Sequence, residues 1–221
     1  TDEEALAEVV PLDEEPQDET DHPPVPSLDN CDLSELDLSD LNFLSISIQN
    51  ANLTKAILNR ANLSNSFLTK STLKNANLND TNLSETDLSE LDLTDLDFLG
   101  ISIQNANLTK AILNRANLSN VSLTKTNLKN VNLNDTNLSE ADLSDANLSQ
   151  ASLEDANLEG STLNGTNLNE ATLERANLRK CKFIDSNLTN ANLNEVTCGL
   201  ADFSRSNLTN AKAVGADFNR V

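Results

Sequence analysis

Residues 46–65 read ISIQNANLTKAILNRANLSN, and the same twenty residues recur without a change at 101–120. In this stretch an Ile or a Leu occupies every fifth position. The spacing extends in both directions over 39 consecutive positions, from Leu28 to Phe218, and Leu, Ile or Phe occupies all of them except Cys198 and Ala213. A repeat of five residues therefore runs through most of the 221-residue chain.

A strict period of five fits neither regular secondary structure. On an α-helix five residues advance by about 500°, so the apolar side chains would drift by about 140° from one repeat to the next. On a flat strand, successive side chains spaced by five would point to opposite faces. The backbone must therefore turn once in every repeat, and the pattern predicts a solenoid.

The other positions of the repeat indicate which side chains face inward. A small residue usually stands two positions before the apolar one, and Asn or Asp usually stands between them. Typical small residues are Ala51, Ala56, Ala61, Ala106, Ala111, Ala116, Ala141, Ala146, Ala151 and Ala156. On a short extended side, residues two apart share a face. The small and the central residues are therefore expected to line the interior, and the other three positions to face water.

The tandem motif A-[ND]-L-x-x, in one register over residues 26–220, resembles the pentapeptide repeat family. The resemblance implies an all-β fold, a right-handed quadrilateral parallel β-helix with four pentapeptides in each coil. Thirty-nine repeats would then form nearly ten coils. At the usual strand separation of about 4.8 Å, the rod would be roughly 45 Å long.

A longer repeat overlies the short one. Residues 31–85 and 86–140 are identical at 46 of 55 positions, which indicates an internal duplication. Each copy comprises eleven pentapeptides, so with four in each coil the copies are offset by two and three quarter coils. Equivalent outward residues, such as Ile57 and Ile112, are then expected on different sides of the rod.

Both copies carry bulky residues at the position that is usually small. They are Leu36, Leu41 and Ile46 beside Phe43 in the first copy, and Leu91, Leu96 and Ile101 beside Phe98 in the second. We expect a wider interior or a local bulge there. Plain variation of the core and a ligand cavity are the two alternatives for its meaning.

Charge is distributed unevenly along the chain, whose formal net charge is −20. Residues 1–25 hold ten acidic residues and no Lys or Arg, and the remaining 196 residues hold 25 acidic against 15 basic ones. The repeats alternate in sign: acidic at 29–40, basic at Lys55, Arg60, Lys70 and Lys74, acidic at 85–97, basic at Lys110, Arg115, Lys125 and Lys129, and acidic at 135–159. A mimic of DNA needs a continuous negative surface, which these bands interrupt.

The two ends raise separate expectations. Residues 1–10 contain a Thr-x-x-Glu capping box and an apolar set that predict a short helix capping the first coil, within an acidic tail of residues 1–25. The prolines between residues 11 and 26 favour a disordered tail instead. At the other end the register continues through Phe218 with no cap, so either the sequence is truncated or the terminal coil pairs with a second subunit in a homodimer.

Sequence features bear on location without fixing it. No run of 18 apolar residues is present, so we expect no membrane span. Recurrent Asn-Leu-Ser and Asn-Leu-Thr sequons favour a bacterial origin over a secreted eukaryotic one, and the resemblance to the pentapeptide repeat family implies a cyanobacterial source. We expect a cytoplasmic protein, although the lack of Met at position 1 leaves the periplasm and the thylakoid lumen open.

Residues for catalysis are scarce. The chain has no Tyr, its one His is His22 in the acidic tail, and Cys31, Cys181 and Cys198 occupy inward positions of the repeat. No nucleophile and base can be assembled from this set, and no glycine-rich phosphate loop is present. The cysteine spacing matches no metal motif. We expect buried inert thiols, no cofactor, no metal and no enzyme.

The expected function is a non-catalytic rod that binds or scaffolds another protein, without direct contact to nucleic acid. The apolar residues at outward positions are the candidate contacts: Phe67, Ile57, Ile112, Leu44 and Leu99. The alternative is a DNA mimic that binds a type II topoisomerase (gyrase), as the resemblance to quinolone-resistance and mycobacterial members implies. A third role, ice or mineral binding, would need regular ranks of Thr, which the outward positions lack.

Overall fold

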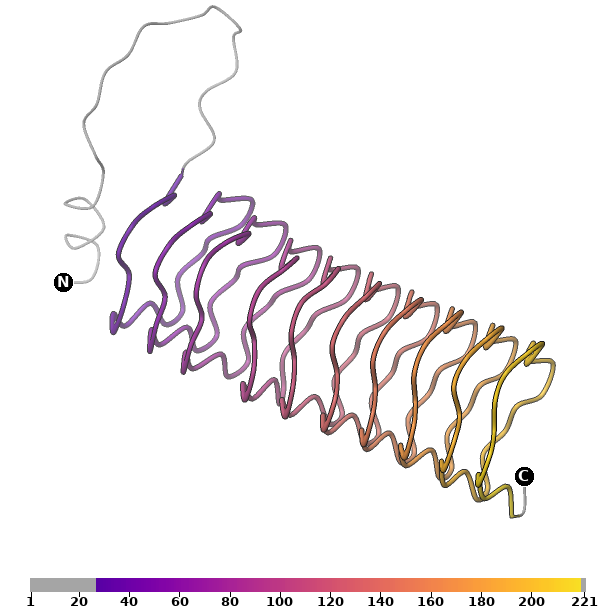
Figure 1. The fold of residues 1–221 in the computed structure, drawn as a ribbon. Coiled ribbons are helices and arrows are strands. Elements are labelled where there is room, and N and C mark those ends of the chain that lie inside the picture. The colour runs from indigo at the N-terminus through magenta and orange to yellow at the C-terminus, as the bar shows by residue number, and fades with distance from the viewer. Residues whose placement is uncertain (1–26, 220–221) are drawn as a thin grey trace, which may run out of the picture.

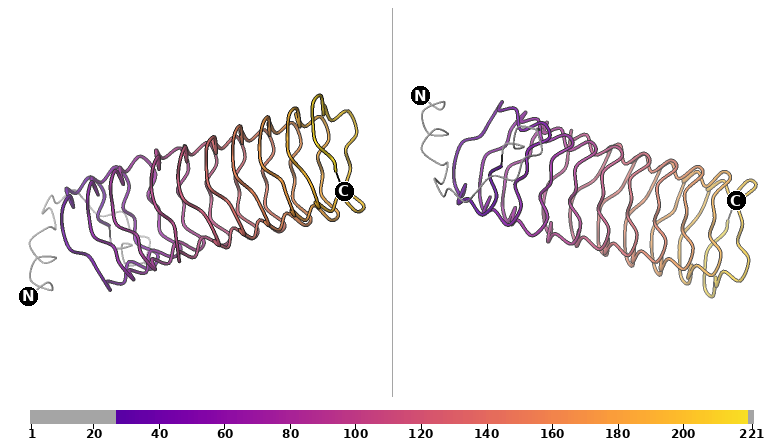
Figure 2. Two further views of the ribbon diagram at one scale, coloured as in Figure 1. Left: turned by 90° about the horizontal axis from the view of Figure 1, so that it is seen from below. Right: turned by 90° about the horizontal axis from the view of Figure 1, so that it is seen from above.

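The computed structural model describes residues 27–219, which form one rod of stacked coils (Figure 1). Within these residues there is no helix, and where two coils pair, each side does so through a single bridge residue instead of a longer strand. The first and the last coil lie at opposite ends of the rod (Figure 2). The expected helix at residues 1–10, the rest of the acidic tail and His22 lie outside the described residues.

Parallel bridges set the length of a coil. Ser27 pairs with Ser47, Asp32 with Asn52, and so on to Thr197 with Asp217, so every bridge joins residues 20 apart. A coil therefore contains four pentapeptides, one for each side. Because the offset between the duplicated copies is not a whole number of coils, equivalent residues lie on different sides: Ile57 pairs with Asp37 and Asn77, whereas Ile112 pairs with Asp92 and Asn132.

Each side ends in a tight turn at the last two residues of the pentapeptide. The main-chain N–H of Ala61, for example, donates to the carbonyl of Leu58 at 2.9 Å. The residue before Ala61 in this turn is Arg60, whose φ is +58°, and a positive φ recurs at every fifth residue from Asn30 to Gly215. A single positive φ at the third residue is the signature of a type II turn. Most of these residues are not glycine, and each such corner carries strain that the stacking must offset.

The Asn or Asp of the repeat stabilises both the turn and the stack. The side-chain oxygen of Asn62 accepts from the N–H of Ser64 at 3.2 Å, an Asx turn that starts the corner. Its side-chain amide donates to Asn42 in the preceding coil at 3.0 Å, and Asn82 donates to Asn62 at 3.3 Å. Equivalent side-chain ladders run along opposite sides of the rod, through Asn107–Asn187 and Asn117–Asn177. This geometry explains why Asn or Asp recurs at this position.

The interior holds the central and the small residues, as the sequence predicts. Central side chains from Leu33 to Cys198 are buried, most of them at 0–1% exposure. In most repeats with Ser or Thr at the small position, the hydroxyl donates to a main-chain carbonyl of the preceding coil; Thr81 donates to Leu58 and Thr136 to Leu113, at 2.8 and 2.9 Å. These buried hydroxyls are thus satisfied, and they lean toward the N-terminal neighbouring coil.

Several charged residues of these bands form ion pairs between consecutive coils. A base at the corner of one coil meets an acid at the same corner of the preceding coil: Lys55 meets Glu35 at 2.7 Å and Arg115 meets Asp95 at 2.7 Å. The same offset of one coil joins Arg60 to Asp40, Lys110 to Glu90, Arg175 to Asp155 and Arg205 to Asp185. Side-chain hydrogen bonds from Arg60 and Arg115 lower the pKa values of Asp40 and Asp95. The alternation of sign therefore pairs neighbouring coils at their corners.

The buried leucine column predicts the effect of Leu118→Asp. Leu118 is 1% exposed, so the substitution removes about 1.5 to 3 kcal/mol of burial and adds an unpaired charge. We expect the free energy of unfolding to fall by at least about 3 kcal/mol, with amide protection lost in the adjacent coils first. Chemical denaturation followed by circular dichroism measures it. Exposed Asn120→Asp in the same repeat is the control, and equal effects of both substitutions would contradict an inward Leu118.

The corner ion pairs predict a local pKa change in Arg115→Gln. Loss of the guanidinium should raise the pKa of Asp95 toward its ordinary value of about 3.9. The unchanged Arg60 should keep the pKa of Asp40 low in the same molecule. A carboxyl whose folded-state pKa is lowered contributes stability above its unfolded-state pKa, and this stability is lost as the pH falls through the folded-state pKa. The variant lacks this contribution, so its acid unfolding should begin at a slightly higher pH than that of the wild type. Carbon-detected NMR titration follows both carboxyls. An Asp95 pKa that stays low would rule out the pairing.

Candidate functional site

The apolar residues that the sequence proposes as partner contacts all face solvent. Their exposed fractions are 50% for Leu44, 36% for Ile57, 46% for Phe67, 53% for Leu99 and 40% for Ile112. Ile57, Phe67 and Ile112 belong to three different bridge columns, so they lie on three different sides of the rod. Leu44 and Leu99 stand at two different corners. The structure does not gather these residues into one patch, and their role in binding stays a prediction.

The three thiols are buried, as the sequence predicts. Burial raises the pKa of Cys181 to about 12 and that of Cys198 to about 11. The sulfur of Cys181 donates to the carbonyl of Leu158 at 2.9 Å, in the place of the usual Ser or Thr hydroxyl. At neutral pH these two groups are therefore protonated and shielded, which suits packing better than nucleophilic chemistry.

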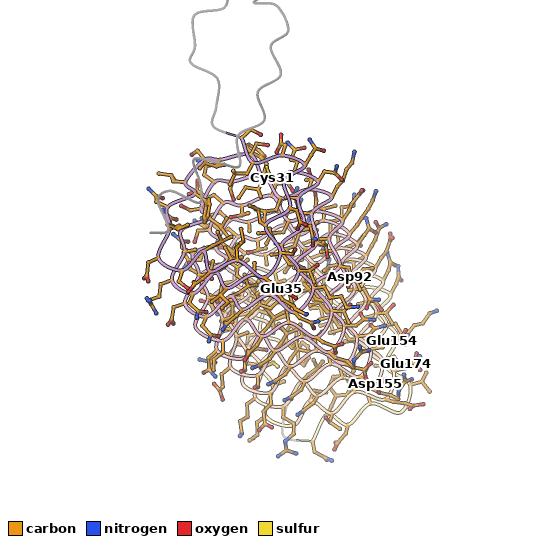
Figure 3. The ribbon with its side chains drawn as sticks, turned by 90° about the vertical axis from the view of Figure 1, so that its left-hand side faces the viewer. Cys31, Glu35, Asp92, Glu154, Asp155 and Glu174 are labelled. Carbon is orange, nitrogen blue, oxygen red and sulfur yellow. The ribbon has the colours of Figure 1, made fainter. Side chains whose placement is uncertain are left out.

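Carboxylates gather around one arginine in the C-terminal half of the rod. Arg175 binds Asp155 and Glu174 at 2.8 and 2.7 Å and lies 3.7 Å from Glu154; the three acidic residues are labelled in Figure 3. The hydrogen bond from Arg175 lowers the pKa of Asp155. The cluster is thus an ion-pair network on the surface. Among residues 27–219, no group of three or more His, Cys, Asp or Glu side chains is arranged to hold a metal ion.

A cleft interrupts the stack where the second copy of the duplication begins. No bridge joins Thr72 to Asp92 or Asn77 to Asp97 within the described residues, although the bridges before and after them are formed. Figure 1 shows the wider spacing between these two coils, coloured purple and magenta. The space between them is a cleft of about 300 Å³, lined by Thr72, Lys74, Asn75, Asp92, Thr94 and Asp95.

The cleft opens at one corner of the coil and closes at the opposite one. At the closed corner the N–H of Leu83 donates to Ser102 at 2.7 Å, and that of Glu85 donates to Gln104 at 2.9 Å. At the open corner the corresponding bonds from Leu73, Asn75 and Leu78 to the next coil are missing. The two coils are therefore splayed, not sheared, with the open side at residues 72–79 and 91–98.

Leu91 and Leu96 hold the two coils apart. Both stand at the small inward position, where side chains lean toward the preceding coil, and both are buried, at 2% and 5% exposure. The equivalent positions of the preceding coil, 20 residues earlier, hold Ser71 and Ala76, so each leucine takes up space that an alanine or a hydroxyl leaves free elsewhere. The neighbouring Ile101 has a milder effect. The N–H of Ser102 donates to the carbonyl of Thr81 at 3.3 Å, whereas the equivalent hydrogen bond on the next side of the coil measures 2.9 Å.

Where the sequence predicts a wider interior or a local bulge in the second copy, the structure shows a separation between two coils. In the first copy, Leu36 and Leu41 meet no described coil on their N-terminal side, and Leu36 is 38% exposed. The bridge from Asp37 to Ile57 is intact there. Sequence reasoning singled out Leu91 and Leu96 but missed the residues that line the cleft, because Thr72, Lys74 and Asn75 are unremarkable members of the repeat.

Comparisons with known proteins agree with this architecture. The family model described as "Pentapeptide repeat region" matches residues 51–128 and 103–173, and the one described as "Pentapeptide repeats (8 copies)" matches residues 27–69 and 181–220. No curated protein sequence matches the chain. In the described part of the chain, no helix is long and apolar enough to span a membrane.

Several solved structures are similar to this chain. One is HetL from the cyanobacterium Nostoc, a pentapeptide repeat protein involved in heterocyst differentiation regulation, with 28% identity, a TM-score of 0.51, and 85% of this chain and 89% of that chain covered. Trypsin-treated QnrB1, a plasmid-mediated fluoroquinolone resistance protein, has 18% identity, a TM-score of 0.46, and coverages of 86% and 90%. The pentapeptide repeat protein Rfr23 from the cyanobacterium Cyanothece has 22% identity, a TM-score of 0.33, and coverages of 60% and 91%.

The five-residue spacing, the coil of four pentapeptides and the family match over residues 51–173, more than half of the chain, lead to one assignment. The chain belongs to the pentapeptide repeat family.

Proposed function

We propose that this protein is a non-catalytic rod that binds or scaffolds another protein through its outward sides and the cleft. The observation that carries the proposal is the division of side chains. Groups with reactive chemistry, the thiols, are buried, and two of them have raised pKa values, whereas the exposed surface is a regular array of amides, hydroxyls and charged side chains, several of which form ion pairs between coils. Such a surface offers many hydrogen-bonding groups on a rigid frame, which suits recognition.

The similarity to HetL supports a regulatory binding role. That protein is described as involved in heterocyst differentiation regulation, and its similarity to this chain extends over 85% of the sequence. A fold shared at 28% identity does not carry a specific partner across, because function resides in surface sites that a shared fold does not determine. The proposal is therefore limited to a protein partner in a regulatory or scaffolding setting.

The alternative function is a DNA mimic that binds a type II topoisomerase. Acidic composition favours it, with a net charge of −20. Against it stands the pairing of corner acids with bases of the next coil, such as Asp40 with Arg60 and Asp95 with Arg115. These pairs break the acidic surface into short bands, unlike the continuous line of charge along a nucleic-acid backbone.

A homodimer through the C-terminal coil forms part of the proposal. In the last described coil, Phe218 is 39% exposed and Val214 is 76% exposed. The rings of Phe183 and Phe203 stack at 4.7 Å, and Phe218 lies 6.2 Å from Phe203 with its ring tilted. A second copy that covers this end would bury the apolar column. Sedimentation equilibrium of the wild type and of Phe218→Ser measures it, and a monomer at high micromolar concentration in both would oppose the dimer.

The two functions predict different results in a gyrase supercoiling assay. We expect no inhibition, and no protection from a quinolone, at micromolar protein, because the acidic surface is interrupted. Inhibition or protection at that concentration would favour the mimic and reject the preferred function. A known topoisomerase-binding member of the family serves as the positive control.

The preferred function predicts capture of a specific protein by the rod without residues 1–25. Immobilised protein with and without this tail is compared on one cyanobacterial lysate. Phe67→Ser should weaken capture at least several-fold, because Phe67 is the outward aromatic residue, whereas Asn147→Ser on the same side should not. Loss of capture on deletion of residues 1–25 would assign binding to the tail instead of the rod.

A further inference from the structure

Two strand edges face each other across the cleft with their main-chain groups unpaired. Elsewhere, Leu53 and Lys55 donate to Thr72 and Lys74 at 2.8 and 2.9 Å. One coil on, the N–H groups of Leu73 and Asn75 have no such acceptor among residues 27–219. Across the cleft, the carbonyls of Asp92 and Thr94 receive no main-chain donor from the described residues. The two facing edges, residues 72–75 and 92–95, form the lips of the cleft. Each lip thus presents the donors or acceptors of a parallel β-bridge without a partner.

Unpaired main-chain groups at a strand edge favour pairing with another chain. A ligand that satisfies both lips must carry donors on one side and acceptors on the other at the spacing of a strand. An extended peptide has this arrangement, whereas a sugar, a nucleotide or a lipid lacks its regular alternation. The cleft volume of about 300 Å³ is at the small end of ligand sites, which suits a segment of a few residues.

Charged residues on the two lips indicate the direction in which a peptide would bind. Lys74 stands on one lip and Asp92 on the other, and neither forms an ion pair within the described residues. Asp95, by contrast, is held by Arg115 at 2.7 Å. Both lips run parallel, and outward residues two apart share a face. A parallel strand with a basic residue opposite Asp92 and an acidic residue two positions later, opposite Lys74, would match both charges.

Leu91 and Leu96, the spacer leucines, keep the site open in the absence of a ligand. Leu91 and Leu96 are buried between the coils, so the apolar interior stays covered although the main chains are apart. Leu73 and Leu78 on the other lip remain 1% exposed. The cleft is therefore lined by main chain and polar side chains above a closed apolar floor, and it does not depend on exposing the core.

We propose that the cleft between residues 72–75 and 92–95 is an acceptor site for a short extended segment of a partner protein, which pairs in parallel with the exposed strand edges. The basic-x-acidic pattern in that segment sets its register through Asp92 and Lys74. This inference rests on the proposed function of a protein-binding rod and names the place and the mode of binding. It makes Leu91 and Leu96 positioning residues, because they act by holding the lips apart.

The first test is amide hydrogen exchange with a blocked pentapeptide, acetyl-Val-Lys-Val-Glu-Val-amide, as the probe. In the free protein, we expect the amides of Leu73 and Asn75 to exchange at least a hundredfold faster than those of Leu93 and Asp95, which donate to the next coil at 2.8 and 3.0 Å. Millimolar peptide should slow the first pair and leave the second unchanged. A peptide with N-methylated main chain should bind at least tenfold more weakly. Equal binding of the two peptides, or no protection at Leu73 and Asn75, would overturn the proposal.

Two double variants make the test specific. Leu91→Ala with Leu96→Ala removes the spacers, so the lips should close, the amides of Leu73 and Asn75 should become protected, and peptide binding should fall at least tenfold. Leu36→Ala with Leu41→Ala makes the same change in the first copy and should leave binding as in the wild type. Circular dichroism confirms that each variant folds. Lys74→Glu, an exposed change, gives a second variant that should weaken binding if the spacer variant does not fold. Unchanged binding in Lys74→Glu and in the spacer variant would reject the site.

The outcomes separate this inference from the proposed function. If the spacer variant loses peptide binding but still captures the protein partner, the rod binds proteins elsewhere and the cleft is not the partner site. If peptides bind at the cleft but no protein is captured by the rod, the cleft is real and the proposed function fails.

Discussion

Main-chain pairing between consecutive coils is the interaction on which the rest of the structure depends. A side of one coil is too short to form a strand on its own, so many of its N–H and C=O groups are satisfied by the coils above and below. This pairing holds the central leucines in one dry column and places each outward residue next to its equivalent in the next coil. Where the pairing fails, at residues 72–79, the stack opens into a cleft.

The corners show how the same constraint selects side chains. Every fifth residue adopts a positive φ, which a non-glycine residue reaches at a cost of about 1–2 kcal/mol. The Asx turn before each corner and the ladders of Asn amides between coils offset part of that cost. Long charged side chains are tolerated at the corner because they extend along the stack to a partner in the preceding coil, as Arg60 does toward Asp40. At such corners an acidic side chain is stabilised by a base of the neighbouring coil.

Periodicity predicted the interior well. The inward positions of the leucines, the buried thiols and the displacement of duplicated residues to different sides all follow from a turn in every fifth residue, with the coil length taken from the resemblance. The ion pairs were not predicted, because Lys55 and Glu35 become neighbours only when the coil length is applied to each charge. The cleft was predicted only as a bulge. Leu91 and Leu96 stood out in the sequence, but their effect depends on the direction in which inward side chains lean, which the repeat pattern does not contain.

The distance between spin labels placed four coils apart tests the stacked coil and its cleft together. Labels at Arg115 and Glu195, on one corner row and without the cleft between them, should lie about 19 Å apart, four times the strand separation. Labels at Lys55 and Asp135, on the same row with the cleft between them, should lie measurably further apart, with an equally narrow distribution. Equal distances would contradict the separation caused by Leu91 and Leu96. Broad distributions for both pairs would contradict the regular coil itself.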